Sequence, residues 1–141
     1  MDTTKRIEIE HLCARLVTAY CLTIDVNDYP AFMELFAPDA EWQRPAPLPL
    51  LRGHAEFRQY LDSRDTSILL RHVPSNVQVD VIDADNAKGI SYVTAYRCPN
   101  YKGGVAPMEG PFIMVEYRDR FVRTPSGWRI GRRNTVVVFA K

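Results

Sequence analysis

The hydrophobic pattern of this chain changes its period once, near Ser67. Before that point apolar residues recur at spacings of three and four, as at Ile9 and Leu12, which is typical of an amphipathic helix. After it, apolar and polar residues alternate, as at Val77 and Val79, and many side chains are β-branched, which is typical of strands. Helices first and a long antiparallel meander afterwards predict an α+β domain.

Proline, glycine and capping residues divide these two patterns into elements. The predicted helices span about 2–25, 29–36 and 54–61, and the predicted strands span 40–43, 67–73, 76–82, 87–97, 111–122 and 128–139. A strongly curved, mostly antiparallel sheet wrapped against three N-terminal helices would form a cone-shaped α+β barrel with one open end. Such a cone predicts a pocket for a small molecule, with loop 99–110 as a candidate rim.

The length and charge of the chain exclude several classes of function. Its 141 residues predict one domain over 1–141, large enough for a hydrophobic core. A formal net charge of +1 provides no broad positive field for nucleic acid or for an anionic membrane. No apolar run approaches the roughly 20 residues that span a bilayer, and the polar N-terminus has no signal-peptide pattern. Three cysteines without CxxC spacing favour neither disulfides nor zinc, so a cytoplasmic protein with reduced thiols is expected.

An acidic residue, Asp25, continues the otherwise apolar stripe of the first predicted helix. A carboxylate at such a position must be hydrogen-bonded, paired or functional, because burying it alone is costly. The expected partner is His72, in the next strongly apolar stretch. A histidine held by a carboxylate can take a proton from carbon, and the carboxylate stabilises the charge that develops on the ring. We therefore interpret the two residues as an acid–base dyad in a pocket, with a purely structural pair as the alternative.

Other catalytic and cofactor patterns are missing from the sequence. The three histidines are widely separated, which predicts no metal cluster, and His11 and His54 are expected to lie in solvent. The sequence contains no glycine-rich phosphate loop, no GxSxG elbow and no Walker pattern. We therefore expect neither a metal nor a cofactor, and a small molecule as the substrate.

Several short motifs follow one another in the order and spacing of a known superfamily. They are Ile24-Asp25 with Asp28, the segment 35–42, Arg71-His72-Val73 with Asn76, and Gly127-Trp128 with Arg133-Asn134. With these motifs the chain resembles, over nearly its whole length, the SnoaL-like branch of the nuclear transport factor two-like superfamily. That branch includes scytalone dehydratase and hexachlorocyclohexane dehydrochlorinase.

The resemblance implies roles for particular residues. It places the dyad on Asp25 and His72, a pocket tryptophan on Trp42, and an arginine near the dyad on Arg133. Tyr20 stands where the dehydrochlorinase has a pocket lysine, and a hydroxyl suits an oxygen leaving group better than a halide. Tyr20 is therefore a catalytic candidate, and a core tyrosine is the alternative.

The alternation of side chains along strands predicts the rest of the pocket. If Arg133 faces inward, the same face carries Thr135, Val137 and, from neighbouring strands in the register of the relatives, Val93, Ala95, Ile113, Val115 and Tyr117. Arg133 could bind an anionic group or neutralise Asp25, and a structural salt bridge is the alternative. Arg44 shares the strand parity of Trp42, and for it a structural salt bridge is preferred over anion binding.

Together these residues predict a cofactor-independent lyase of the dehydratase type. His72 would remove a proton from a carbon of a small cyclic or polyketide-like substrate, Asp25 would orient His72, and Tyr20 would polarise an oxygen. The alternatives are an isomerase or polyketide cyclase with the same dyad, and a non-catalytic ligand-binding or partner subunit. The resemblance implies a dimer or trimer, and the last strand, 135–139, is apolar on both faces, so a homo-oligomer is expected.

Overall fold

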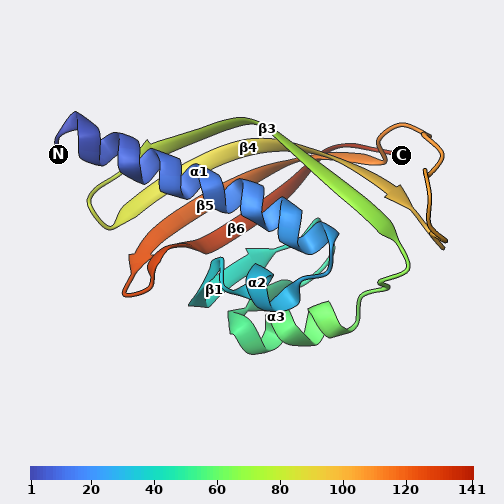
Figure 1. The fold of residues 1–141 in the computed structure, drawn as a ribbon. Coiled ribbons are helices and arrows are strands. Elements are labelled where there is room, and N and C mark those ends of the chain that lie inside the picture. Colours follow the sequence, from blue (N-terminus) through green and yellow to red (C-terminus); the bar gives the residue numbers. More distant parts are fainter.

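Three helices pack against a curved sheet (Figure 1). The computed structural model describes residues 1–141. The helices are α1 (Thr3–Asp25), α2 (Tyr29–Met33) and α3 (Gly53–Asp62), and the strands are β1 (Phe36–Gln43), β2 (Leu50–Arg52), β3 (Leu69–Val81), β4 (Asn86–Cys98), β5 (Ile113–Thr124) and β6 (Gly127–Ala140). None of the helices combines the length and the apolar character that a membrane span requires.

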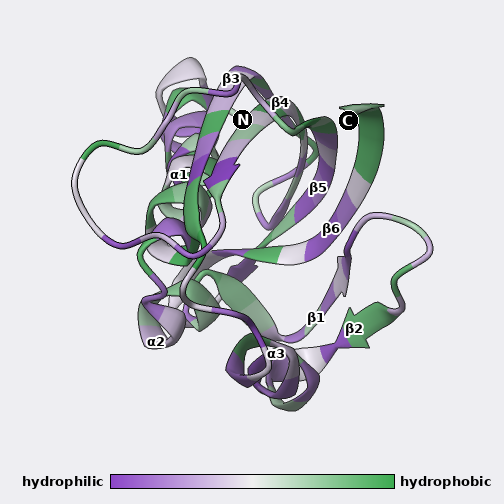
Figure 2. Cartoon of the chain, turned by 90° about the vertical axis from the view of Figure 1, so that its right-hand side faces the viewer, coloured by the Kyte–Doolittle hydropathy of each residue, from purple (hydrophilic) through white to green (hydrophobic).

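The six strands form one sheet in the order β2-β1-β6-β5-β4-β3. β1 pairs with β6 in parallel, and every other pair of neighbouring strands is antiparallel. Figure 2 shows the sheet curving from β3 through β6, with β1, β2 and α3 below it in this view. The sheet is open, because β2 and β3 occupy its two edges. The predicted α+β class, with helices on a mostly antiparallel sheet, is thus confirmed.

The long helix α1 positions one side of the site. It begins where the Asp2 side chain accepts a hydrogen bond from the backbone N–H of Lys5, an N-cap that satisfies one of the free donors of the first turn. Its apolar stripe is buried against the sheet through Ile9, Cys13, Leu16, Val17, Tyr20, Cys21 and Ile24. The helix ends at Asp25, as predicted, and Asn27 then turns the chain with a positive φ of 58°. The last two turns of α1 therefore present Tyr20 and Asp25 to the strands beside them.

One strand, β3, replaces the two strands predicted over 67–73 and 76–82. Its pairing with β4 continues past residue 75, with a shift of register between Ser75 and Gln78. Asn76 lies inside this shift with a positive φ of 51°. The prediction of a break was wrong because the asparagine forms a β-bulge, which bends the strand without ending it.

The segment around the first strands also differs from the prediction. The second helix ends at Met33 and not at residue 36, and β1 begins at Phe36 and not at residue 40. The register of β1 on β6 shifts between Phe36 and Glu41, where Pro38 has no N–H to donate to the ladder. His54 is also not in solvent, since it is half-buried and its Nε2 lies 3.1 Å from the carbonyl oxygen of Phe36.

Aromatic rings fill the space between the helices and the lower part of the sheet. The ring of Trp42 has its centroid 5.3 Å from that of Phe32 and 6.1 Å from that of Tyr20. Phe57 of α3 closes the cluster at 5.5 Å from Trp42. The rest of α3 is mostly hydrophilic in Figure 2, and only Phe57 and Leu61 of this helix are buried. Tilted and edge-on aromatic contacts of this kind favour one arrangement of the rings, which fixes the floor of the site.

The end of β6 is less covered than the rest of the sheet. Val137, Val138 and Phe139 are exposed in the isolated chain, at 40%, 45% and 69%. The apolar character of this strand on both faces therefore has no explanation within one subunit. Its burial by a second copy stays a prediction.

The three cysteines are expected to differ sharply in reactivity. Burial raises the pKa of the Cys13 thiol to about 12, and burial is also the main cause that raises the pKa of Cys21 to about 12, whereas Cys98 is half-buried. At pH 8 only about one in 10⁴ of the two buried thiols would be ionised, and the thiolate is the reactive form. Titration of the folded protein with a disulfide reagent such as 5,5′-dithiobis(2-nitrobenzoate) should therefore modify one thiol.

The replacement Cys98→Ser should leave no rapidly reacting thiol in the folded protein, and unfolding in guanidinium should expose all three in the parent chain. Rapid labelling of Cys13 or Cys21 at pH 8 without unfolding would contradict the packing of α1.

Candidate active site

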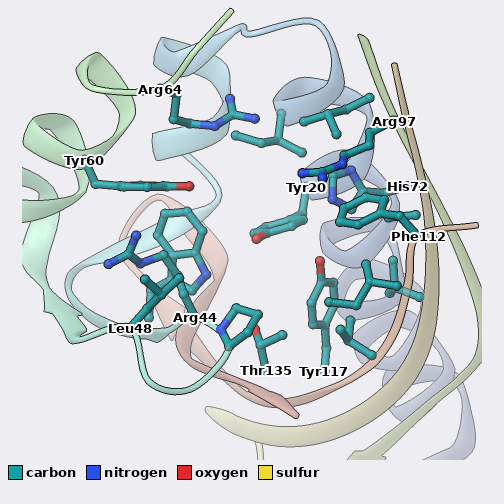
Figure 3. Close-up of a pocket in the computed structure, with 18 residues that line it drawn as sticks. Tyr20, Arg44, Leu48, Tyr60, Arg64, His72, Arg97, Phe112, Tyr117 and Thr135 are labelled. Carbon is teal, nitrogen blue, oxygen red and sulfur yellow. The ribbon is translucent and has the colours of Figure 1, made fainter. Parts of the chain in front are cut away.

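A cavity of about 410 Å³ lies between the end of α1, the β1–β2 loop, α3 and the sheet. This volume is within the usual range for small-molecule sites. The cavity is lined by 18 residues, 12 of them hydrophobic (Figure 3): Tyr20, Ile24, Trp42, Arg44, Pro45, Leu48, Tyr60, Arg64, Leu70, His72, Val93, Ala95, Arg97, Phe112, Ile113, Val115, Tyr117 and Thr135.

The side chains of Asp25 and His72 meet at the wall of this cavity. The Nδ1 atom of His72 lies 2.5 Å from Oδ1 of Asp25, and the backbone N–H of His72 donates to Oδ2 at 2.9 Å. Both carboxylate oxygens are thus bonded to one residue, which fixes the position of β3 against the end of α1. The Asp25 side chain is only 6% exposed, and the His72 side chain is 18% exposed.

This contact determines which nitrogen of the ring can act as a base. A carboxylate accepts hydrogen bonds, so a neutral imidazole in this contact would hold its hydrogen on Nδ1, facing Asp25, and its lone pair on Nε2. His72 lines the cavity, whereas Asp25 lies behind it. The arrangement can therefore accept a proton at Nε2 and stabilise the resulting imidazolium with a buried carboxylate.

Two tyrosines lie next to one another deep in the cavity. Tyr20 and Tyr117 are 5% and 3% exposed, their ring centroids are 5.3 Å apart, and Figure 3 shows both hydroxyls directed into the cavity. Burial raises the pKa of Tyr20 to about 12, although the positive charge of Arg133 and a hydrogen bond from Tyr117 oppose the rise. Burial also raises the pKa of Tyr117 well above its usual value. Both hydroxyls therefore stay protonated at neutral pH and can donate hydrogen bonds.

A buried ion pair supports these tyrosines. The guanidinium of Arg133 donates to the two carboxylate oxygens of Asp119 at 2.8 and 2.7 Å, and neither side chain is more than 1% exposed. Burial alone would lower the pKa of Arg133, but the neighbouring Asp119 carboxylate holds it above its usual value. The guanidinium carbon lies 4.2 Å from the ring centroid of Tyr20 and 3.9 Å from that of Tyr117, close enough for cation–π attraction.

The predicted role of Arg133 needs correction. It neither lines the cavity nor forms an ion pair with Asp25, because Asp119 accepts the hydrogens of its Nε and Nη2 atoms. The structure instead shows the alternative that was considered for Arg133, a structural salt bridge. Asp119 was missed in the sequence: it shares the strand parity of Tyr117, which indicates its inward direction but not its pairing with Arg133.

Most of the other predicted pocket residues do line the cavity: Trp42, Val93, Ala95, Ile113 and Val115 do so, together with Tyr20 and Tyr117. Their contact with a substrate stays a prediction. Val137 is not among the lining residues and is 40% exposed. It shares the inward parity of Thr135, but it lies in the exposed last part of β6.

Three arginines line the cavity: Arg44, for which anion binding was the less favoured interpretation, and Arg64 and Arg97, which were not predicted. The preferred salt bridge for Arg44 was wrong, because no carboxylate oxygen lies within 4.0 Å of its guanidinium. Arg97 shares the strand parity of Ala95, so alternation along β4 would have found it. Arg64 follows α3 in a connecting segment, where no periodic signal exists. The structure groups no three His, Cys, Asp or Glu side chains in a way that could hold a metal ion.

Comparison with known proteins agrees with this architecture. The SnoaL-like domain family matches residues 5–134 of the chain. A comparison with curated protein sequences found no match.

Solved structures supply the remaining relatives. A candidate scytalone dehydratase from Novosphingobium aromaticivorans is 20% identical with a TM-score of 0.85, and the match covers 99% of this chain and 91% of that one. A variant of Rv3472 from Mycobacterium tuberculosis, a protein of unknown function, is 26% identical with a TM-score of 0.77 and coverages of 98% and 77%. A type 2 hexachlorocyclohexane dehydrochlorinase (LinA) is 16% identical with a TM-score of 0.74 and coverages of 95% and 91%. At such identities the likeness establishes the fold.

Proposed function

Because the chain belongs to the SnoaL-like domain family, we propose that its cavity is the active site of a cofactor-independent lyase of the dehydratase type. Its substrate would be a small cyclic or polyketide-like molecule with a hydroxyl group β to a carbonyl. The observation that carries this proposal is the imidazole of His72, which lines the cavity and is fixed from behind by the buried carboxylate of Asp25.

The proposed reaction begins at His72. Its Nε2 atom takes a proton from the carbon next to the carbonyl, and the electron pair of that C–H bond forms an enolate. The enolate then expels the β-hydroxyl group as a carbon–carbon double bond forms, and the imidazolium returns its proton to the departing oxygen, so that water leaves. Asp25 stabilises the imidazolium between these two transfers.

The two buried tyrosines supply the second part of the mechanism. A neutral hydroxyl can donate a hydrogen bond to an enolate oxygen, and the raised pKa of Tyr20 keeps its proton in place while that charge develops. Donors held in a dry, preorganised site stabilise a developing charge more strongly than water does. The guanidinium of Arg133 lies over the ring of Tyr20 and over the ring of Tyr117, and these contacts hold the two rings in place.

A simple β-hydroxy ketone tests the proposal. The compound 3-hydroxy-1-tetralone loses water across C2 and C3 to give naphthalen-1(4H)-one, which tautomerises to 1-naphthol as a C4 proton moves to the oxygen, and this product is fluorescent. The protein is expected to accelerate this reaction at neutral pH over the rate in buffer. In deuterium oxide, recovered substrate would carry deuterium at C2 if proton removal is reversible.

Two tyrosine variants serve as a matched control for this assay. Tyr20→Phe removes one hydroxyl from the cavity and should lower kcat about tenfold, which corresponds to one lost hydrogen bond of about 1.4 kcal/mol. Tyr92 lies on the same sheet but is 37% exposed and outside the cavity, so Tyr92→Phe should leave kcat unchanged. Absence of both naphthol formation and C2 exchange with the parent protein would contradict a proton-abstracting role on this class of ketone.

The same groups favour a second candidate, an isomerase. Two neutral hydroxyls beside a base can hold a dienolate and allow the proton to return at another carbon. Cyclohex-3-enone tests this alternative, because its conversion to cyclohex-2-enone moves a double bond without losing water. Conversion of the enone without dehydration of the tetralone would favour isomerisation.

A further inference from the structure

The charged groups that line the cavity are all of one sign. Three arginines, Arg44, Arg64 and Arg97, contribute to its wall, and no aspartate or glutamate does. None of the three forms a salt bridge with any carboxylate of the chain. No ion pair within the chain therefore neutralises these three guanidinium groups.

Arg44 is the most informative of the three. It is only 9% exposed, and its buried Nε atom has no hydrogen-bond partner. Its one contact with an oxygen is a long hydrogen bond from Nη2 to the carbonyl of Pro49 at 3.4 Å, and its guanidinium carbon lies 4.1 Å from the ring centroid of Tyr60. A buried, unpaired cation is destabilising unless something else compensates its charge.

The other buried arginine provides an internal comparison. Arg133 is fully buried as well and its Nη1 atom also has no partner, but its charge is compensated, because Asp119 accepts two hydrogen bonds from its other two nitrogens. The chain therefore pairs a buried guanidinium with a carboxylate where the charge has a structural role. Arg44 faces the cavity and lacks such a partner, which points to a carboxylate that arrives with a ligand.

The hydrogen-bonding and stacking partners of the two remaining arginines are neutral. Arg64 donates to Oδ1 of Asn27 and to the hydroxyl of Tyr29, both at 3.1 Å. Arg97 stacks on the ring of Phe112, with its guanidinium carbon 4.7 Å from the centroid. Both keep their full positive charge and add to the attraction for an anion in the cavity.

The loop that carries Arg44 is held in place. The side-chain nitrogen of Gln43 donates to the backbone carbonyls of Arg44 at 3.0 Å and Leu48 at 2.9 Å, which closes the β1–β2 loop on itself. A guanidinium on a fixed loop loses little freedom when a ligand binds, and its planar fork matches a carboxylate. The site is therefore arranged before a ligand arrives.

We propose that the cavity takes a ligand that carries a carboxylate group and that Arg44 receives this group. The identification of that ligand as a substrate rests on the proposed function. In Figure 3, Arg44 and Tyr60 lie on one side of the cavity, His72 and Phe112 lie on the other, and the tyrosine hydroxyls lie between them. The substrate would thus be an apolar ring compound with its carboxylate at one end and its reacting carbon at the other.

A pair of aromatic probes of the same shape tests the charge preference. Binding of 2-naphthoate and of its neutral analogue 2-naphthamide can be measured by isothermal titration calorimetry. The naphthoate is expected to bind about tenfold more tightly or better, as for one charge-assisted hydrogen-bonded contact. Arg44→Met should remove most of this preference by weakening naphthoate binding while naphthamide binding changes less than about twofold.

An arginine outside the cavity provides the matched control. Arg118 is exposed and bonds Glu116, so Arg118→Met should leave both affinities unchanged. Equal affinity of the two probes for the parent protein would overturn the proposal, and so would an equal loss of both in Arg44→Met, which would indicate a role in shape alone. If Arg44→Met does not fold, Arg44→Lys is the second variant, because it keeps the positive charge and loses the planar fork of the guanidinium. Unchanged selectivity for naphthoate in Arg44→Lys would overturn the assignment of carboxylate binding to the guanidinium.

The test does not depend on turnover. The replacement His72→Asn removes the proposed base and should keep the preference for naphthoate, since it leaves Arg44 in place. A protein that binds the carboxylate selectively but dehydrates no ketone would refute the proposed reaction and support the ligand class. A protein that dehydrates the tetralone but binds naphthoate and naphthamide equally well would support the proposed reaction and refute the ligand class.

Discussion

Replacing His72 with asparagine is expected to abolish dehydration of 3-hydroxy-1-tetralone while leaving the fold intact. The amide nitrogen of asparagine lies where histidine has Nδ1, so it can still donate to Asp25 and keep that buried carboxylate bonded. The variant lacks an atom in place of Nε2, which is the proposed base. Loss of a positioned general base lowers kcat by roughly 10²–10⁴-fold, which steady-state fluorescence assays would measure.

The variant His72→Ala separates catalysis from stability. It removes the base and also the side-chain partner of Asp25, so it should be inactive and less stable by about 1–3 kcal/mol, because a buried acceptor loses a hydrogen bond. Thermal unfolding should thus distinguish the two variants, whereas the activity assay should not. If His72→Asn keeps more than about a tenth of the parent kcat, His72 is not the base.

The sequence indicated the dyad because its two residues break a strong pattern. Asp25 comes four residues after the buried Cys21 and directly after the buried Ile24, so it is an acid at the end of the apolar stripe of α1, and a stripe of this kind specifies which residues face the sheet. His72 lies in the next apolar stretch, which became β3. Periodicity could not anticipate the bulge at Asn76, since an asparagine beside Pro74 and Ser75 is equally typical of a turn.

The buried ion pair shows where alternation along strands is insufficient. Counting back from the turn between Thr124 and Gly127 pairs Asp119 with Arg132, which is exposed. The register of β5 on β6 shifts between Arg120 and Phe121, where Gly131 is the extra residue on β6. This bulge places Asp119 opposite Arg133. A shift of one residue reverses every assignment beyond it. The partner of Arg133 therefore required the coordinates, although the inward direction of Arg133 did not.

The largest loss of stability is expected from Asp119→Asn. This replacement leaves the guanidinium of Arg133 fully buried with no opposite charge near it. Removal of one partner of a buried ion pair costs about 3–5 kcal/mol, since the remaining charge is neither paired nor solvated. In a chain of this size such a loss lowers the Tm by roughly 10–20 °C, which differential scanning calorimetry would detect.

An exposed pair of the same residue types provides the control. Asp85 and Arg123 form an ion pair in which the side chains are 59% and 52% exposed, so Asp85→Asn should cost less than about 1 kcal/mol. The double replacement Asp119→Leu with Arg133→Met removes both charges and should recover most of the stability, because an apolar pair of similar volume needs no solvation. If Asp119→Asn destabilises the protein no more than Asp85→Asn does, the ion pair of Asp119 and Arg133 is not shielded from water. The inference that this pair supports Tyr20 and Tyr117 would then be wrong.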